Sequence, residues 1–317
     1  MSRIYLAPME GLADALLRDL ITRTGGYDGA VCQFVRVSGT SLPSRTFRRV
    51  CPELEHGSRT PSGTPVSVQL LGSNPELMGE TAARLARLSP CGIDLNFGCP
   101  ATTVNRHGGG AMLLDDPGLL QRIAEAVRRA VPVAIPVTAK MRLGICDTAR
   151  TLDCAAALQA GGVAALVVHA RTKDEGYRPP AHWEWIARVR EAVSIPVIAN
   201  GEIWSLADYV RCREVSGCAD VMIGRGAVAD PFLTRRIRTG DDGDLMKDWA
   251  QLSPLLQEFW QRVQLCVMAR HAPGRLKLWL SLLQRGYPQA AALYERIRAC
   301  NDIGAVSSAL AAATVLE

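Results

Sequence analysis

The stretch VAALVVHARTKDEGYRPPAHWEWIARVREAVSIPVIANGEI, residues 163–203, joins two short apolar runs through one helical stretch. The runs Ala165–His169 and Val197–Asn200 are apolar at nearly every position, which is typical of strands buried on both faces of a parallel sheet. Between them, Trp183–Val193 has the amphipathic pattern of a helix. The stretch therefore predicts a strand–helix–strand unit.

The same alternation recurs along most of the chain. Eight apolar runs are predicted as strands: Ile4–Pro8, Ala30–Phe34, Val66–Leu71, Gly92–Asn96, Val137–Arg142, Ala165–His169, Val197–Asn200 and Asp220–Ile223. The helical stretches between them are Ala13–Thr24, Pro75–Leu88, Pro117–Val131, Thr148–Ala160, Trp183–Val193 and Ser205–Val215. Asn74-Pro75 and Asp116-Pro117 each supply an N-cap followed by proline, and Ser205 is a further cap.

Eight strand–helix units predict an α/β fold of the (β/α)8 TIM barrel type. A doubly wound open sheet is the alternative, but no Gly-x-Gly-x-x-Gly follows the first run. The segment 239–244 reads as a linker, and only helical periodicity follows it. Its apolar stripe consists of Trp249, Leu252, Phe259, Trp260, Val263 and Val267, and a last helix is expected over Ala305–Leu316. We therefore expect a barrel over residues 1–240 and a small C-terminal all-helical domain over 241–317.

Composition restricts the class of protein. The chain has 317 residues, of which 48% are hydrophobic and 21% charged, which excludes a disordered protein. The longest charge-free apolar stretch, Cys154–Ala170, is short and interrupted by glycines, and the N-terminus does not resemble a signal peptide. We expect a soluble cytoplasmic protein without a membrane segment. Ten cysteines without Cys-x-x-Cys spacing predict reduced thiols and no metal site.

Basic residues are concentrated in two segments. Residues 30–51 contain four arginines and no acid, and residues 262–298 contain seven basic residues against one acid. Such blocks complement a polyanion, although a solvated helix face would produce the same pattern. The long segment Val35–Thr64 is rich in Arg, Ser, Thr, Pro and Gly, a composition and length often found in functional loops.

Polar residues close nearly every predicted strand, where barrel enzymes collect their chemistry. Gly201, Gly224 and Gly226 expose backbone N–H groups that suit a phosphate. Lys140 supplies a cation of the kind that a reduced flavin requires near its N1 atom. An imine-forming Lys140, a packed His169 and glycines that serve only tight turns are the competing interpretations. Taken together, the residues point to a flat, anionic, hydrogen-bonding ligand.

Cys99 lies in a Gly-Cys-Pro turn directly after a predicted strand. The glycine loop Asn-Arg-His-Gly-Gly-Gly-Ala follows at residues 105–111. A thiol there can act as a nucleophile or as a proton donor, since an unperturbed thiol is mostly protonated at neutral pH. A purely structural cysteine is the alternative.

These motifs resemble the tRNA-dihydrouridine synthase family. The matching segments are Ala-Pro-Met-Glu-Gly (7–11), Asp-Leu-Asn-Phe-Gly-Cys-Pro (94–100), Gly-Gly-Gly-Ala (108–111), Lys-Met-Arg-Leu-Gly (140–144), His-Ala-Arg-Thr (169–172), Ile-Ala-Asn-Gly-Glu-Ile (198–203) and Met-Ile-Gly-Arg-Gly (222–226). Phe97 is a mild departure from the family pattern. The segments 34–38 and 272–280 are most similar to the bacterial branch that acts at D-loop position 16 of tRNA.

The resemblance implies an FMN-binding catalytic barrel and a tRNA-binding helical domain, with NADPH as reductant. It implies hydride transfer from the flavin to C6 of a uridine and proton delivery from Cys99 to C5. The residues implied to hold FMN are Pro8, Met9, Glu10, Gln69, Lys140, His169, Asn200, Gly201, Glu202, Gly224 and Arg225. The substrate and tRNA contacts predicted with them are Arg36, Asn96, Arg142, Tyr177, Arg275 and Lys277. We expect tRNA as partner and a monomer.

Three other functions remain open from the residues. An FMN barrel acting on a free pyrimidine, similar to the dihydroorotate dehydrogenases, explains the flavin-type residues but leaves the basic helical tail without a role. A barrel aldolase would use Lys140 as its imine lysine. A non-catalytic RNA-binding protein leaves the polar strand ends without a purpose.

Overall fold

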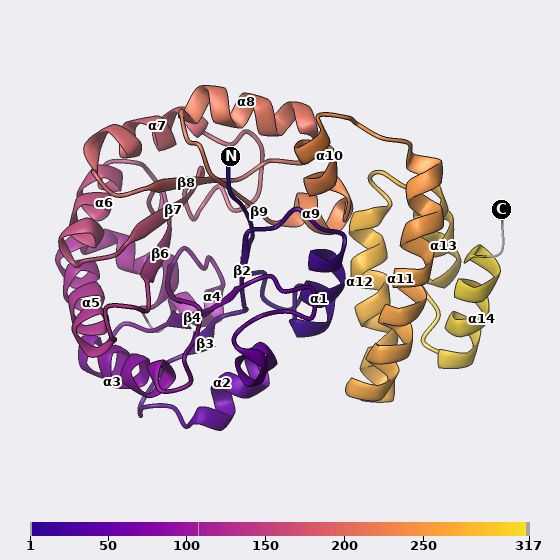
Figure 1. The fold of residues 1–317 in the computed structure, drawn as a ribbon, viewed down its shortest axis with the longest axis horizontal. Coiled ribbons are helices and arrows are strands. Elements are labelled where there is room, and N and C mark those ends of the chain that lie inside the picture. The colour runs from indigo at the N-terminus through magenta and orange to yellow at the C-terminus, as the bar shows by residue number, and fades with distance from the viewer. Residues whose placement is uncertain (1, 107, 315–317) are drawn as a thin grey trace.

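The computed structural model describes residues 2–106 and 108–314, so His107 of the glycine loop and residues 315 and 316 of the expected last helix lie outside the described residues. Parallel strands form the centre of the larger part of the molecule (Figure 1). They are β1 (Ile4–Leu6), β2 (Gly29–Val31), β3 (Val35–Arg36), β4 (Val66–Leu71), β5 (Ile93–Phe97), β6 (Val137–Arg142), β7 (Ala165–His169), β8 (Val197–Asn200) and β9 (Val221–Ile223).

The sheet closes on itself. β1 pairs with both β2 and β9, and β2 pairs with β4, so the hydrogen-bonded strand order returns to its start. The predicted TIM barrel is confirmed, with all eight predicted strands present, and the open-sheet alternative is wrong. β3 is an additional short strand on β4.

β3 arises from a one-residue irregularity. Ala30 pairs with Val66, an offset of 36, whereas Val35 pairs with Leu70, an offset of 35. One extra residue is therefore accommodated between β2 and β3, as in a β-bulge, and such bulges redirect side chains near functional sites. Here the side chain of Gln33 donates to the Met9 carbonyl oxygen at 3.2 Å.

Helices connect the strands, and most of them cover the outside of the barrel (Figure 1). They are α1 (Ala15–Arg23), α2 (Ser44–Val50), α3 (Pro75–Ala86), α4 (Thr102–Asn105), α5 (Pro117–Ala130), α6 (Thr151–Ala160), α7 (Trp183–Ala192), α8 (Leu206–Ser216), α9 (Arg225–Ala229) and α10 (Leu233–Thr239). Short 3-10 turns occur at Pro52–His56, Gly110–Asp115 and Ala269–His271. The three predicted caps are confirmed, because Asn74, Asp116 and Ser205 each accept a backbone N–H three residues on.

Four further helices follow the barrel and pack beside α1, α9 and α10 (Figure 1). They are α11 (Leu245–Cys266), α12 (Ala272–Leu283), α13 (Pro288–Ile297) and α14 (Ile303–Thr314). The predicted C-terminal helical part is confirmed, and its predicted stripe is buried except for Val267, which is only partly so. The predicted division at residue 240 lies between α10 and α11; as a division of function it stays a prediction.

The apolar core forms two clusters. A small one lies inside the barrel and includes Val31, Val167, Ile198 and Met222. The large one lies between strands and helices and continues without a break into α11–α14. Among the described residues no helix is long and apolar enough to cross a membrane.

Asn74 gives a direct test of the predicted capping. Its Oδ1 accepts from the Leu77 N–H at 2.9 Å at the start of α3. We expect Asn74→Ala to lower the free energy of unfolding by about 1 kcal/mol in urea titrations. Asn74→Asp keeps an acceptor at the same place and should lower the free energy of unfolding by only a few tenths of a kcal/mol. Equal losses in both variants would contradict the capping role.

Candidate active site

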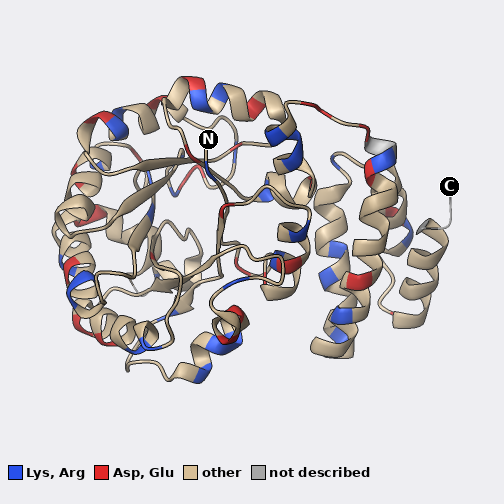
Figure 2. Ribbon diagram, viewed as in Figure 1, with Lys and Arg blue, Asp and Glu red and all other residues tan. Residues whose placement is uncertain are grey.

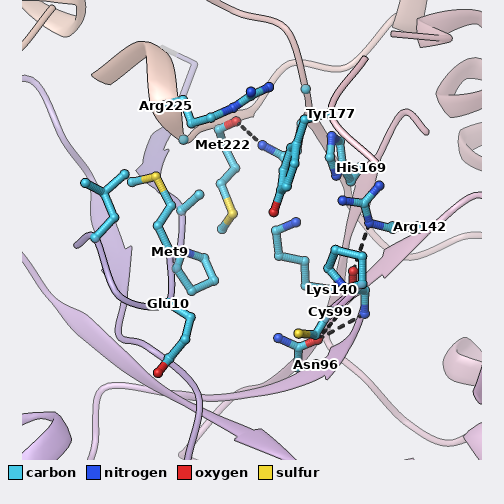
Figure 3. Close-up of a pocket in the computed structure, with 18 of the residues that line it drawn as sticks. Met9, Glu10, Asn96, Cys99, Lys140, Arg142, His169, Tyr177, Met222 and Arg225 are labelled. Carbon is cyan, nitrogen blue, oxygen red and sulfur yellow. Dashed lines mark hydrogen bonds between the residues drawn. The ribbon is translucent and has the colours of Figure 1, made fainter. Parts of the chain in front are cut away.

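A cavity of about 590 Å³ opens where the strands end, at the mouth of the barrel (Figure 3). A volume of this size suits a drug-sized or cofactor-sized ligand. All eleven residues predicted to hold a flavin line it, as do Cys99 and three of the predicted substrate residues. The residues that sequence reasoning gathered at the strand ends therefore lie around one space, although their roles stay predictions.

Cys99 lies at the cavity wall in a loop fixed by Asn96 (Figure 3). Asn96 Oδ1 accepts from the N–H groups of Gly98 at 3.0 Å and Cys99 at 2.9 Å, and its Nδ2 donates to Gln69 Oε1 at 2.8 Å. Gln69 in turn donates to the buried Asp94 at 2.7 Å. The side chain of Asn96, predicted to fix the base, is thus engaged in holding the turn that presents the thiol.

Burial raises the pKa of the Cys99 thiol, with Glu10 adding to the effect and Arg142 and Arg36 opposing it. Desolvation disfavours the thiolate, so the thiol keeps its proton at neutral pH. A partly exposed, protonated thiol facing a cavity is suited to donating a proton.

Lys140 rises from β6 and points into the cavity (Figure 3). Burial, reinforced by the neighbouring Arg142, lowers its pKa to about 8, while Asp94 acts in the opposite direction. Within the described residues no carboxylate forms an ion pair with Lys140. A partly buried cation without an ion-pair partner costs free energy, so an electron-rich or anionic ligand in the cavity would stabilise Lys140.

His169 ends β7 beside Lys140. Burial lowers its pKa well below the usual value, and the charges of Arg142, Lys140, Arg171 and Arg225 act in the same direction. The ring is therefore neutral, and it can donate one hydrogen bond and accept another. It is a wall of the cavity rather than a residue of the apolar core.

Gly201, Gly224 and Gly226 line one end of the cavity, called the glycine end below. At two of these positions glycine is required for steric reasons. Gly201 has φ +120°, and a Cβ there would lie 3.0 Å from the His169 ring. A Cβ at Gly226 would lie 2.0 Å from the carbonyl oxygen of Ile203. Gly224 and Arg225 lie directly before it, so backbone and guanidinium donors meet here as an anion requires.

The carboxylate of Glu202 is engaged by neighbouring side chains. It accepts from Trp204 Nε1 at 2.9 Å and pairs with the buried Arg171, while Arg225 lies 4.0 Å away. Burial alone would raise the pKa of Glu202, but the hydrogen bonds from Arg171 and Trp204 outweigh it and keep the carboxylate ionised. Glu202 therefore positions Trp204 and Arg171 around the anion-binding end.

The six predicted substrate residues lie in three places. Asn96, Arg142 and Tyr177 line the cavity. The guanidinium of Arg142 donates to three backbone carbonyl oxygens, and these hydrogen bonds join the loop around Cys99 to the loop around Tyr177. Arg36 lies outside the lining but close enough to act on the Cys99 thiol.

Arg275 and Lys277 lie on α12 and are not among the residues that line the cavity. Arg275 donates to the carbonyl oxygens of Gly11 and Leu12 and pairs with Asp14 at 2.6 Å. Lys277 donates to Asn301 at 3.0 Å. Arg275 thus joins α12 to the barrel, a role that sequence reasoning did not predict.

The family model described as dihydrouridine synthase matches residues 5–281. The chain belongs to the dihydrouridine synthase family. A relative from Cupriavidus necator, named tRNA-dihydrouridine(16) synthase, is 59% identical over 303 residues, which cover 95% of this chain and 94% of that protein. A relative of the same name from Ralstonia nicotianae is 55% identical and covers 98% and 97%.

Solved structures share the fold of this dihydrouridine synthase family member. A 2-naphthoyl-CoA reductase matches 76% of this chain and 50% of its own with a TM-score of 0.58 at 11% identity. A histamine dehydrogenase from Rhizobium sp. 4-9 matches 75% and 46% with a TM-score of 0.56 at 16% identity. An old yellow enzyme homologue from Zymomonas mobilis matches 75% and 88% with a TM-score of 0.51 at 12% identity.

Sequence reasoning missed several cavity residues of this family member. Phe34, Trp204 and Met222 line the cavity without having been singled out as site residues. Trp204 carried a usable signal, because it follows the strand-end motif Asn-Gly-Glu-Ile directly. Phe34 ends the predicted strand Ala30–Phe34, but its place in the cavity wall depends on the bulge between β2 and β3, which the run does not show.

The glycine loop gives a test of how the Cys99 turn is held. Gly110 has φ +62°, and a Cβ there would lie 2.7 Å from the Cys99 carbonyl oxygen; Gly108 has φ +65° and open space around it. We expect Gly108→Ala to cost about 1 kcal/mol of unfolding free energy from backbone strain alone. Gly110→Ala should cost about 1–3 kcal/mol more because of the clash.

Urea unfolding of the two single variants measures the difference. Since both positions have nearly the same positive φ, the contrast isolates the crowding at Gly110, where the Cys99 carbonyl oxygen is the nearest atom. Equal losses would show that the loop does not press on the Cys99 turn.

Proposed function

We propose that this protein reduces a D-loop uridine of tRNA, at position 16, to 5,6-dihydrouridine with a bound FMN. The observation that carries the proposal is the meeting of Cys99, Lys140 and Arg142 in one cavity at the barrel mouth. Its relatives named for position 16 match the chain over nearly its whole length, which supports the choice of position.

The cavity fits an FMN. Lys140 brings a cation that forms no ion pair with any carboxylate of the described residues, Gln69 and Asn200 bring amides, and the glycine end offers donors for a phosphate. Met9 presents an apolar side chain on the side opposite Lys140, suited to a flat ring (Figure 3), and Pro8 also lines the cavity. We take NADPH as the reductant because the family resemblance implies it.

When bound and reduced, the flavin supplies the hydride that adds to C6 of the uracil ring. The negative charge that then develops on the base requires a proton at C5. Cys99 holds that proton, because burial keeps its thiol protonated. Arg142 places a fixed positive charge beside the thiol and base, and its three backbone hydrogen bonds hold it there.

The substrate must reach this cavity from folded RNA. A uridine stacked inside tRNA has to be turned out before it can enter a barrel mouth. Exposed arginines on α2, among them Arg45 and Arg49, and Lys277 on α12 offer phosphate contacts outside the cavity (Figure 2). Arg36 and Tyr177 lie nearer the mouth, where they would contact the flipped nucleotide.

The direct experiment is a turnover assay with position mapping. The purified, flavin-loaded protein is incubated with NADPH and unmodified tRNA, and dihydrouridine is located by mass spectrometry of nuclease fragments. Reduction at position 16 is the expected result. Reduction at another position would contradict the choice of position alone, and reduction of free pyrimidines but not of tRNA would contradict tRNA as the substrate.

Cys99→Ala tests the proton donor. We expect this variant to keep its bound flavin and the reduction of that flavin by NADPH, but to form dihydrouridine about 100-fold more slowly or worse, as expected when a general acid is lost. Cys91→Ala is the matched control, since Cys91 precedes β5 at the opposite end of the barrel. Full turnover by Cys99→Ala would exclude the thiol from the reaction.

Lys140 makes flavin binding dependent on pH. Its charged form is present below its pKa of about 8 in the free protein and is lost as the pH rises above that value. Because the ligand favours the charged form, we expect the FMN dissociation constant to be about tenfold larger at pH 9 than at pH 7.

Fluorescence titrations of wild type and Lys140→Arg measure this dependence. An arginine keeps its charge throughout this range, so its profile should be flat. A flat wild-type profile would contradict a role for the Lys140 charge in binding.

A further inference from the structure

The C-terminal helices hold the short helix that carries Arg225. Trp279 of α12 donates its indole N–H to the Val228 carbonyl oxygen at 3.1 Å, within α9. The hydroxyl of Tyr287 donates to Asp230 Oδ1 at 3.0 Å, at the end of the same helix. Both aromatic side chains are fully buried, and α12 lies directly beside α9 (Figure 1). The position of Arg225 therefore depends on the C-terminal helices.

Arg285 extends this connection to the cavity wall. Its guanidinium carbon lies 4.1 Å from the centre of the Trp204 ring, and that of Arg225 lies 5.0 Å from the same ring. Arg225 also stands 4.5 Å over the ring of Tyr177. Guanidinium groups and aromatic rings thus alternate in a column from α12 to the cavity mouth, an arrangement with favourable cation–π geometry.

The column is rich in positive charge. Arg225 has one nearby carboxylate, Glu202 at 4.0 Å, and that carboxylate is already paired with Arg171. Among the described residues Arg285 forms no ion pair with any carboxylate. Like charges held this close to one another are stabilised by an anion between or beside them.

We propose that Arg285 completes the phosphate end of the flavin site, so that the C-terminal helices are part of the cofactor site and not only an RNA-binding surface. This inference rests on the proposed function, because it assigns the anion to the FMN phosphate. Arg285 is a positioning residue: it holds Trp204, which lines the cavity, and it adds charge from behind that wall.

The contact between Arg285 and Trp204 favours the cofactor over RNA. Arg285 lies against Trp204, and the indole N–H of Trp204 turns to Glu202 at 2.9 Å, a residue of the glycine end of the cavity. Arg285 as a residue is exposed, so an RNA phosphate can also reach it. Binding to RNA is therefore an outcome that the experiment below can show.

The test compares FMN with riboflavin, which has the same ring but no phosphate. Dissociation constants of both are measured by flavin fluorescence on full-length, flavin-stripped protein at low and high salt. In Arg285→Ala we expect FMN to bind about five- to tenfold more weakly at low salt, with a smaller difference at high salt. Riboflavin affinity should not change.

Two control variants separate the effect of the Arg285 charge from the effect of removing any arginine from these helices. Arg296→Ala removes one exposed arginine from α13, in the same group of helices, and should leave both affinities unchanged. Arg285→Lys keeps the charge and should retain most of the FMN affinity. The tRNA affinity of each variant is measured in parallel by electrophoretic mobility shift.

Three results would overturn the inference. FMN affinity unchanged in Arg285→Ala would exclude the role, and weaker tRNA binding with intact FMN binding would make Arg285 an RNA contact instead. An equal loss of FMN and riboflavin affinity would indicate packing and not phosphate recognition. A wild-type protein that binds neither flavin would contradict the proposed function as well, so the two failures are distinguishable.

Discussion

The pairing of β2 with β4 is the constraint on which the site depends, because it closes the sheet into a barrel. In an open sheet the ends of β1 and β6 would lie far apart along one edge. In the closed barrel Met9 and Lys140 face each other across a single cavity (Figure 3). Closure therefore converts a series of polar strand ends, separated along the chain, into one binding site.

A second layer of interactions holds the loops of that site. Asn96 fixes the Cys99 turn, Arg142 joins two loops through backbone carbonyls, and Glu202 holds Trp204 and Arg171. Most polar side chains around the cavity thus have a structural partner, whereas Lys140 and the Cys99 thiol remain directed at the cavity. That contrast separates the residues that shape the site from those available for chemistry, and it supports the assignment of proton donor and cation.

The barrel and much of the site could be predicted from the sequence, because their signals are local. Apolar runs, caps such as Asn74 and strand-end motifs each occupy a few consecutive residues. The rest depends on contacts between distant segments. The ion pair of Arg275 with Asp14 spans 261 positions, and no local pattern distinguishes an arginine that docks on the barrel from one that binds RNA. The single extra residue between β2 and β3 was likewise invisible, since the run Ala30–Phe34 reads as a continuous strand.

The central claim is that a flavin in the barrel cavity passes its electrons directly to a uridine of tRNA. A single-turnover experiment tests it most directly: reduced holoprotein is mixed with unmodified tRNA without oxygen or NADPH, and flavin absorbance and dihydrouridine are followed together. We predict that the flavin is reoxidised and that one dihydrouridine at position 16 appears for each flavin oxidised. A flavin that stays reduced in the presence of tRNA, yet is reoxidised by a free pyrimidine, would contradict the account.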